Sequence, residues 1–471
     1  MLFNSISFLV FFPIVTLLYY LLAFRFRWIL LLLASCIFYM FFIPEYILII
    51  FVTIIIDYLA GIYIENAEGH KKKMYLIVSI VSTCLVLIVF KYFNFFQQNI
   101  ESLLQIFGFN FKATTFNILL PIGLSFHTFQ SLSYVIEVYR GNQKAEKHFG
   151  IYSLYVMFYP QLVTGPIERP QNLLTQLRQE KVFEYQNLAN GLRLMLFGFF
   201  VKMVIADNLG TYVDLVYTSP ADFSSSSVRW ATLFYSFQIY GDFFAYSTIA
   251  VGAALCMGYS LMDNFKSPYL SKSIGEFWSR WHISLSTWFR DYVYFSLGGN
   301  KVAISKWIFN ILIVFAISGF WHGASWTFVI WGLAHGFIYI LESFFPFNQE
   351  IKNKLTRVQL YLLDSILVLK TFVITSLIWI LFRAQNLETA KTIFNSTLNN
   401  NMGTKNLEID NKIFYFLGLF ILIELLLYNK RFDKWCGARK VWVRWIIYLA
   451  LIALTILYSS VQDYAFIYFQ F

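Results

Sequence analysis

Apolar residues occur along this chain in long runs separated by short polar connections. Each run holds about 17 to 25 residues, the length that an α-helix needs to cross a membrane. Such spans are predicted to begin near Ile6, Trp28, Tyr46, Met74, Asn117, Phe149, Leu188, Trp230, Ile304, Trp326, Val358, Ile413 and Val441. The run from Trp230 to Tyr259 can form one kinked span or two short ones. The pattern predicts an all-α polytopic membrane protein with about 11 to 13 transmembrane helices. Because no loop is long enough for a soluble domain, residues 1–471 are expected to form one membrane domain.

One polar segment does not follow this pattern. Residues 277–292 read FWSRWHISLSTWFRDY, and as one helix at about 100° per residue they place aromatic and aliphatic side chains on one face. That face comprises Phe277, Trp278, Trp281, Leu285, Trp288, Phe289 and Tyr292. The segment is too short and too charged to span, so we expect it to lie at the membrane surface or to be buried in protein.

Lysine and arginine residues occupy every second loop near the amino terminus, which predicts cytoplasmic loops there and an extracytoplasmic amino terminus. The first apolar run lacks a basic start and a cleavage site, so it is predicted to remain as a span. The alternation fails between Gly165 and Arg193. A neighbouring segment is therefore expected to be re-entrant or to lie on the surface, and such backbone is tolerated only within protein or beside a water-filled cavity.

Composition supports the membrane class and excludes several others. The chain is 58% hydrophobic and 13% charged, with a net charge of +10. In a membrane protein this charge reflects topology, so no nucleic-acid partner is expected. Walker, zinc-protease and serine-hydrolase motifs are absent from the sequence. The cysteines are isolated, which favours packing over a disulfide, a zinc site or a thiol nucleophile; they are Cys36, Cys84, Cys256 and Cys436.

Two histidines are the main candidates for chemistry. His322 lies in a break between two apolar spans, where a neutral imidazole can act as a general base. The small residues from Gly319 to Ser325 are expected to leave room for a substrate. An equal alternative is that His322 only hydrogen-bonds a neighbouring helix. His282 either orients a thioester, activates a hydroxyl or hydrogen-bonds at the edge of an interfacial helix, and loop charges place it toward the face opposite to that of His322.

The other four histidines are weaker candidates for chemistry; they are His70, His127, His148 and His335. His70 and His148 lie in basic loops, so solvation by water is their expected role. Ionisable residues within spans are functional hypotheses because burying them is costly. They are Asp57, Glu137, Asp242 and Glu424, with Lys91 and Lys202 near enough to span ends to reach the surface. Asp242 has many hydroxyl and aromatic neighbours in the sequence, and helix-to-helix hydrogen bonding is its main alternative role.

Several motifs resemble those of the membrane-bound O-acyltransferases. They are LPIGLSFHTFQSLSYVIEVYRG, YPQLVTGPIERP, WSRWHISLSTWFRDY and GFWHGASW. The resemblance is to the bacterial branch with the alginate and peptidoglycan O-acetylation membrane subunits, related to the teichoic-acid D-alanylation membrane protein. It extends to about Glu342, with a motif-bearing core at about 117–342.

This resemblance implies a ring of tilted helices around a central tunnel, with His322 as the catalytic histidine and His282 as a second polar position near the donor entrance. Substrate contacts are expected from Arg280, Trp281, Trp321, Ser325, Asp242 and Asn264. The sequence departs from the family's common residues at His127, Thr248 and Ser279.

The function expected from these features is acyl transfer, most simply of acetyl from acetyl-CoA or another cytoplasmic thioester to an extracytoplasmic hydroxyl of an exopolysaccharide such as alginate or of a cell-wall polymer. The thioester is the donor substrate, and neither a tightly bound cofactor nor a metal is expected. Expected partners are membrane lipid and a secreted or membrane-anchored serine-esterase-like acetyltransferase, at the inner (cytoplasmic) cell membrane. The alternatives are D-alanyl transfer to teichoic acid, a transporter or flippase with gating histidines, and a non-catalytic scaffold.

Overall fold

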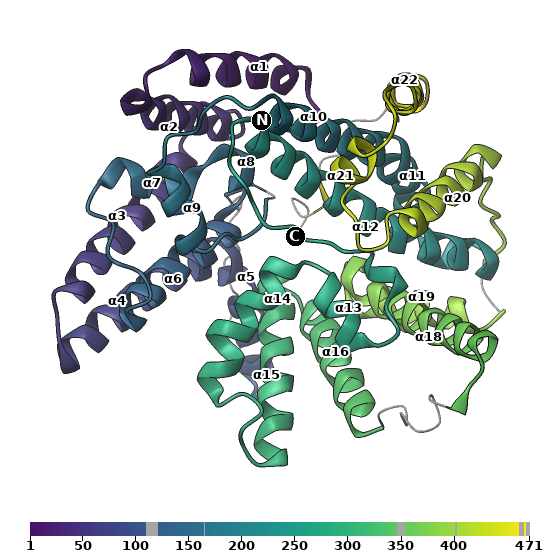
Figure 1. The fold of residues 1–471 in the computed structure, drawn as a ribbon. Helices are drawn as coiled ribbons and strands as arrows, with labels where there is room; N and C mark the ends of the chain where they lie inside the picture. The colour runs from purple at the N-terminus through teal and green to yellow at the C-terminus, as the bar shows by residue number, and fades with distance from the viewer. Residues whose placement is uncertain (110–120, 164, 346–353, 401–402, 461–465, 468–471) are drawn as a thin grey trace. The chain divides into compact units, whose positions relative to one another are not determined.

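The structure is a computed structural model that describes residues 1–109, 121–163, 165–345, 354–400, 403–460 and 466–467. Regular structure in these residues is helical, apart from one isolated parallel bridge between Phe223 and Lys405. Figure 1 shows the labelled helices, coloured from purple at the amino terminus to yellow at the carboxyl terminus. They belong to two compact units, one of residues 1–192 and 250–262 and the other of residues 193–249 and 263–471. The predicted all-α class is confirmed.

The first unit contains the helices up to α9, the beginning of α10 and the last turns of α12. Its elements are α1 (Ile6–Leu21), α2 (Phe24–Met40), α3 (Tyr46–Glu65), α4 (Gly69–Leu87), η1 (Ile88–Tyr92), α5 (Phe93–Ile106), α6 (Leu124–Arg140), α7 (Phe149–Met157), α8 (Tyr159–Leu162) and α9 (Pro170–Leu177). The buried carboxylate of Asp57 on α3 accepts hydrogen bonds from Ser79 at 2.6 Å and Thr83 at 3.0 Å on α4. Asp57 thus joins two helices.

The second unit contains the rest of α10 and of α12, together with the other helices. They are α10 (Tyr185–Phe200), η2 (Val201–Ala206), α11 (Asp207–Thr218), η3 (Pro220–Asp222), α12 (Ser225–Cys256), η4 (Pro268–Leu270), α13 (Ile274–Arg280), α14 (Ile283–Phe289), η5 (Arg290–Tyr294), η6 (Phe295–Leu297), α15 (Ile304–His322), α16 (Trp326–Phe344), α18 (Arg357–Arg383), α19 (Leu387–Leu398), α20 (Asn411–Leu426), α21 (Phe432–Gly437) and α22 (Val441–Tyr458). The run that begins near Trp230 forms the single 32-residue helix α12.

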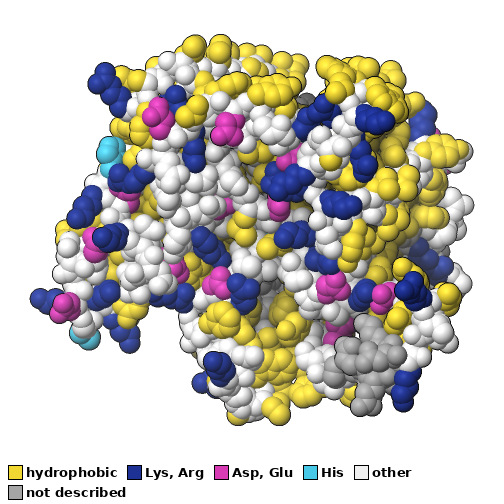
Figure 2. Space-filling view, in the orientation of Figure 1, with side chains coloured by type: hydrophobic (Ala, Val, Ile, Leu, Met, Phe, Trp, Pro, Cys, Tyr) yellow, Lys and Arg dark blue, Asp and Glu magenta, His cyan; other side chains and the backbone are white. Residues whose placement is uncertain are grey.

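Eight helices in the described part of the chain are long and apolar enough to cross a membrane. Helices α1, α2 and α20, with 16, 17 and 16 residues, are close to the lower limit for a span. Large apolar side chains are exposed along α1 and α22, and Figure 2 shows this hydrophobic surface. Such a surface is stable beside lipid. The protein is therefore a multi-pass membrane protein.

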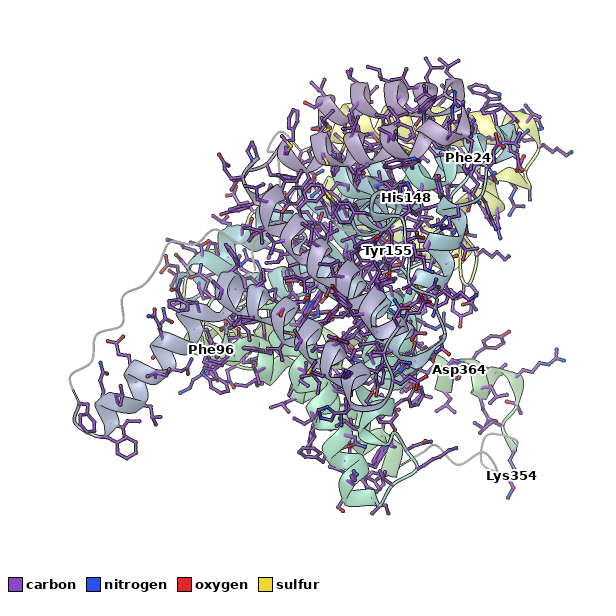
Figure 3. All side chains as sticks on the ribbon, turned by 90° about the vertical axis from the view of Figure 1, so that its left-hand side faces the viewer. Phe24, Phe96, His148, Tyr155, Lys354 and Asp364 are labelled. Carbon is purple, nitrogen blue, oxygen red and sulfur yellow. The ribbon has the colours of Figure 1, made fainter. Side chains whose placement is uncertain are left out.

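The expected span at Phe149 is wrong. Helix α7 has only 9 residues and ends where Phe158 leaves the helical conformation, so it is about 14 Å long against a hydrocarbon core of about 30 Å. His148 caps its first turn by accepting from the Ile151 amide at 3.2 Å, which adds a structural role to the expected solvation. Figure 3 labels His148 before α7 and Tyr155 within it. The predicted start at Asn117 lies outside the described residues.

Figure 3 also labels Phe96, which lies on α5. None of the residues of α5 is buried, and four of its large apolar side chains are exposed: Phe96, Ile100, Leu103 and Ile106. The helix continues from α4 through the π-helical turn η1, in which a single wider turn changes the face that is presented.

Candidate functional site

The segment around His282 is a broken helix. The single helix expected over 277–292 is wrong, because α13 ends at Arg280 and α14 begins at Ile283. Between them His282 has φ +42° and ψ +55°, a left-handed conformation that interrupts the helical path. Of the two expected placements, membrane surface or protein interior, the structure shows the second. Six of the seven residues of the expected aromatic and aliphatic face are buried, and Trp278 is half-buried.

Helix α13 is held by polar contacts at its start. The Ser273 hydroxyl caps it by accepting from the Glu276 amide at 3.1 Å. The Ile274 amide donates to Glu342 of α16 at 2.7 Å, and Lys272 forms a 2.6 Å ion pair with Asp364 of α18. The first two contacts satisfy amides that a helix start otherwise leaves unpaired. The contacts with Glu342 and Asp364 join the start of α13 to α16 and α18.

A cluster of aromatic rings packs between α13, α16 and α18. Within it Phe277 and Trp281 are stacked at 5.4 Å between ring centroids, Trp281 and Trp379 lie 5.0 Å apart, and Trp331 stacks on Trp379 at 5.6 Å. Phe382 completes the cluster, 5.0 Å from Trp331. Burial of such large rings contributes strongly to stability, and the cluster packs against His322 through Trp331 and Phe382.

His282 and His322 both lie beside the ring of Trp321. The Trp321 ring centroid is 4.8 Å from that of His322 and 6.3 Å from that of His282. Both histidines are buried, with His282 0% and His322 3% exposed. His322, the last residue of α15, also packs edge-on against Trp331 at 5.1 Å and Phe382 at 5.2 Å. The structure therefore brings together three of the site residues predicted from the sequence, His282, Trp321 and His322.

Two of the small residues beside His322, Gly319 and Gly323, serve helix packing. The expected room for a substrate beside the imidazole stays a prediction. A Cβ atom on Gly319 would lie 2.1 Å from the Phe328 carbonyl oxygen, and one on Gly323 would lie 2.1 Å from the Phe328 ring. The space that a side chain would need is filled by α16. Ser325 is the N-cap of α16, accepting from the Thr327 amide at 3.3 Å.

Arg280 and Trp281 are placed differently from what a donor-binding role suggests. The Arg280 guanidinium donates to Glu276 at 3.0 Å, to the Lys266 carbonyl at 3.0 Å, to Asn429 at 2.9 Å and to Tyr428 at 2.9 Å. Four of the five N–H groups of the guanidinium thus donate hydrogen bonds within the protein. Trp281 is 1% exposed inside the aromatic cluster. Both residues stabilise the break at His282.

Asp242 belongs to a buried ion triad. Lys202 lies 2.7 Å from Asp242 and 2.6 Å from Asp207, and Asp242 also accepts from the Ile467 amide at 2.7 Å. Lys202 is 1% exposed, so the expectation that it reaches the surface is wrong; two carboxylates compensate its charge in the interior. The alternative role predicted for Asp242, bonding between helices, is the one that these contacts support.

Sequence reasoning missed two neighbours of the histidines. Phe243 on α12 packs edge-on against His282 at 4.5 Å. Trp331 contacts His322 and, at the same centroid distance of 5.1 Å, His335. Trp331 and His335 are four residues apart on α16, a spacing that places them on one helix face and that marks them in the sequence as packing partners.

Burial lowers the pKa of His282 to about 3 by desolvation, and this residue lies outside the candidate spans. Its imidazole is therefore neutral in the folded protein at neutral pH. In the unfolded chain it gains a proton below about pH 6.5. Its contribution to stability is thus present above pH 6.5 and is lost as the pH falls toward 3.

We therefore expect acid to destabilise the wild type more than a His282→Gln variant. At pH 5.5 the proton gained by the unfolded wild type lowers the free energy of unfolding by about 1.4 kcal/mol relative to pH 7.5, and the variant lacks this term. Denaturant unfolding of both purified proteins at the two pH values measures it. Equal losses in both would contradict a neutral buried imidazole.

Comparisons with known proteins show which family the chain resembles. The sequence model of the membrane-bound O-acyltransferase family matches residues 148–382, a range that includes both histidines and the whole aromatic cluster. The chain is 36% identical over 393 residues to the probable alginate O-acetylase AlgI of Pseudomonas aeruginosa, which covers 83% of this chain and 73% of that protein.

Two further relatives differ in the acyl group that their names give. The peptidoglycan O-acetyltransferase of Helicobacter pylori is 34% identical over 388 residues, which is 76% of this chain and 71% of that protein. The teichoic acid D-alanyltransferase of Bacillus subtilis is 31% identical over 253 residues, which is 50% of this chain and 62% of that protein.

Proposed function

Because this chain belongs to the membrane-bound O-acyltransferase family and is an O-acyltransferase, we propose that it transfers acetyl from a cytoplasmic thioester such as acetyl-CoA to an extracytoplasmic hydroxyl. The acceptor chain is an exopolysaccharide or a cell-wall polymer. Acetyl is favoured over D-alanyl because the two O-acetylating relatives match 83% and 76% of this chain, whereas the D-alanyl relative matches 50%.

In the proposed reaction His322 is the general base. Its neutral imidazole accepts the proton of the acceptor hydroxyl while the hydroxyl oxygen attacks the thioester carbonyl carbon. The carbon–sulfur bond then breaks, and the imidazolium returns the proton to the leaving sulfur, so that an ester and a free thiol form. His282, which also contacts Trp321, orients the thioester. The observation that carries this proposal is the contact of Trp321 with both imidazoles.

The proposed setting is the inner (cytoplasmic) cell membrane, with the amino terminus outside and all 471 residues acting as one acyltransferase domain. A serine-esterase-like acetyltransferase on the outer side is the proposed partner that carries acetyl to the polymer. The alternating basic loops support this orientation. The names of the two O-acetylating relatives, which specify alginate and peptidoglycan, support a polymer as the final acceptor.

Donor turnover by the purified protein tests this proposal. The protein is reconstituted in lipid vesicles with acetyl-CoA labelled in its acetyl group, and released thiol and labelled ester are measured against vesicles without protein. We expect thiol release that depends on the protein and on an added hydroxyl acceptor. D-alanyl carrier protein in place of acetyl-CoA tests the other acyl group. Movement of labelled substrate across the membrane without new ester would instead favour a transporter.

A further inference from the structure

Asn264 lies where three segments of the second unit meet. Its backbone carbonyl accepts from the Ile283 amide at 2.9 Å, and its side-chain oxygen accepts from the Ser284 amide at 3.3 Å. Its side-chain nitrogen donates to the Ser247 hydroxyl on α12 at 3.1 Å. Asn264 itself is 2% exposed. All three of these contacts point to the start of α14 or to α12.

The start of α14 depends on these contacts. The first amides of a helix have no partner within the helix and are usually satisfied by the N-cap side chain. Here the N-cap residue is His282, whose side chain makes no capping hydrogen bond. Asn264, eighteen positions earlier in the sequence, supplies the two acceptors. The histidine ring is thereby released from capping and can point elsewhere.

Two residues of α12 fix both the ring and the backbone of this site. Phe243 contacts the His282 ring edge-on at 4.5 Å, and Ser247 holds Asn264. They are four residues apart, so they lie on the same face of α12. The His282 ring and the amides that follow it are therefore held against one helix face.

We propose that Asn264 is a positioning residue, which holds His282 in its left-handed backbone conformation and so fixes the direction of the imidazole. A non-glycine residue with this conformation persists only where its surroundings enforce it, and the contacts of Asn264 provide that enforcement. This inference rests on the proposed role of His282 in orienting the thioester. It replaces the expectation that Asn264 binds substrate.

The test uses the full-length reconstituted protein and labelled acetyl-CoA. For Asn264→Ala we expect kcat to fall about 10- to 100-fold with little change in the KM for the donor. We also expect faster amide hydrogen exchange at Ser284, whose acceptor is the Asn264 side chain. For Asn264→Asp we expect most of the activity to return, because a carboxylate can accept from both the Ser284 amide and the Ser247 hydroxyl. For Ser247→Ala, which removes only the acceptor of the Asn264 side-chain nitrogen, we expect an intermediate loss of kcat. This variant replaces Asn264→Ala in the test if Asn264→Ala does not fold.

The matched control is Asn386→Ala, which removes an asparagine cap from α19, where Asn386 accepts from the Thr389 amide at 2.8 Å. Equal losses of activity per folded protein in the two alanine variants would overturn the proposal. A higher donor KM with unchanged kcat, or failure of Asn264→Asp to restore activity, would also overturn it and indicate direct substrate binding. A His282→Gly variant with full activity would instead remove the proposed role of His282, whatever Asn264→Ala does.

Discussion

Replacing His322 with alanine is expected to lower acyl transfer by about 10²- to 10⁴-fold, the range for loss of a general base. Without the imidazole the acceptor hydroxyl keeps its proton and remains a weak nucleophile. The measurement is formation of labelled ester by protein purified to equal amounts. His322→Gln should lose activity to the same extent, because an amide of similar size fills the space but does not accept a proton at neutral pH.

A matched variant separates chemistry from packing in this experiment. His335 is buried at the same ring distance of 5.1 Å from Trp331 and packs against Phe277 and Trp278. His335→Ala should therefore destabilise the aromatic cluster about as much as His322→Ala while activity per folded protein is retained. Full activity of the His322 variants would remove that residue from the mechanism, and parallel losses at both positions would indicate packing alone.

Replacing Gly332 with alanine is expected to lower the free energy of unfolding by at least about 2 kcal/mol. A Cβ atom there would lie 2.1 Å from the Phe315 carbonyl oxygen and 3.2 Å from the Gly319 nitrogen. Because these are backbone atoms of α15, no side-chain rotation relieves the clash and the two helices must separate. Unfolding of the purified protein in mixed detergent micelles, followed by tryptophan fluorescence, measures the loss.

Gly418→Ala is the control for the intrinsic effect of the substitution. Gly418 lies inside α20, and a Cβ atom there meets nothing within 4 Å. Alanine favours a helix over glycine by about 0.5–1 kcal/mol, so this variant should be unchanged or slightly more stable. If both variants behave alike, the close approach of α15 and α16 through their glycines is not what stabilises this pair.

The helices could be predicted from the sequence where one long apolar run gives one element. The starts expected at Ile304 and Trp326 are the observed starts of α15 and α16, and Tyr46 and Val441 begin α3 and α22. Such runs carry their signal locally, because lipid exposure selects apolar residues over a whole span. The choice of His282 and His322 also came from local motifs, and the structure places both next to Trp321.

The details of the site could not be predicted in the same way because they depend on contacts between distant residues. The helical period over 277–292 contains no sign of the break at His282, beyond which the amides of Ile283 and Ser284 donate hydrogen bonds to Asn264. The sequence does not show that Asp242 and Lys202 form an ion pair, because the two residues lie on different helices, α12 and η2, which meet only in the fold. The glycines near His322 cannot be recognised as packing positions in the sequence, whereas in the structure Gly319 and Gly323 lie directly against Phe328 of α16.

The positive φ of His282 also limits which amino acids the chain tolerates at that position. Glycine adopts such a backbone freely and asparagine or aspartate with modest strain, whereas β-branched residues are strongly disfavoured. If every amino acid is tested at this position, an inactive valine or isoleucine variant would indicate a misfolded turn and not the loss of the imidazole. Only the small set of amino acids that fit the backbone would reveal what the imidazole itself contributes.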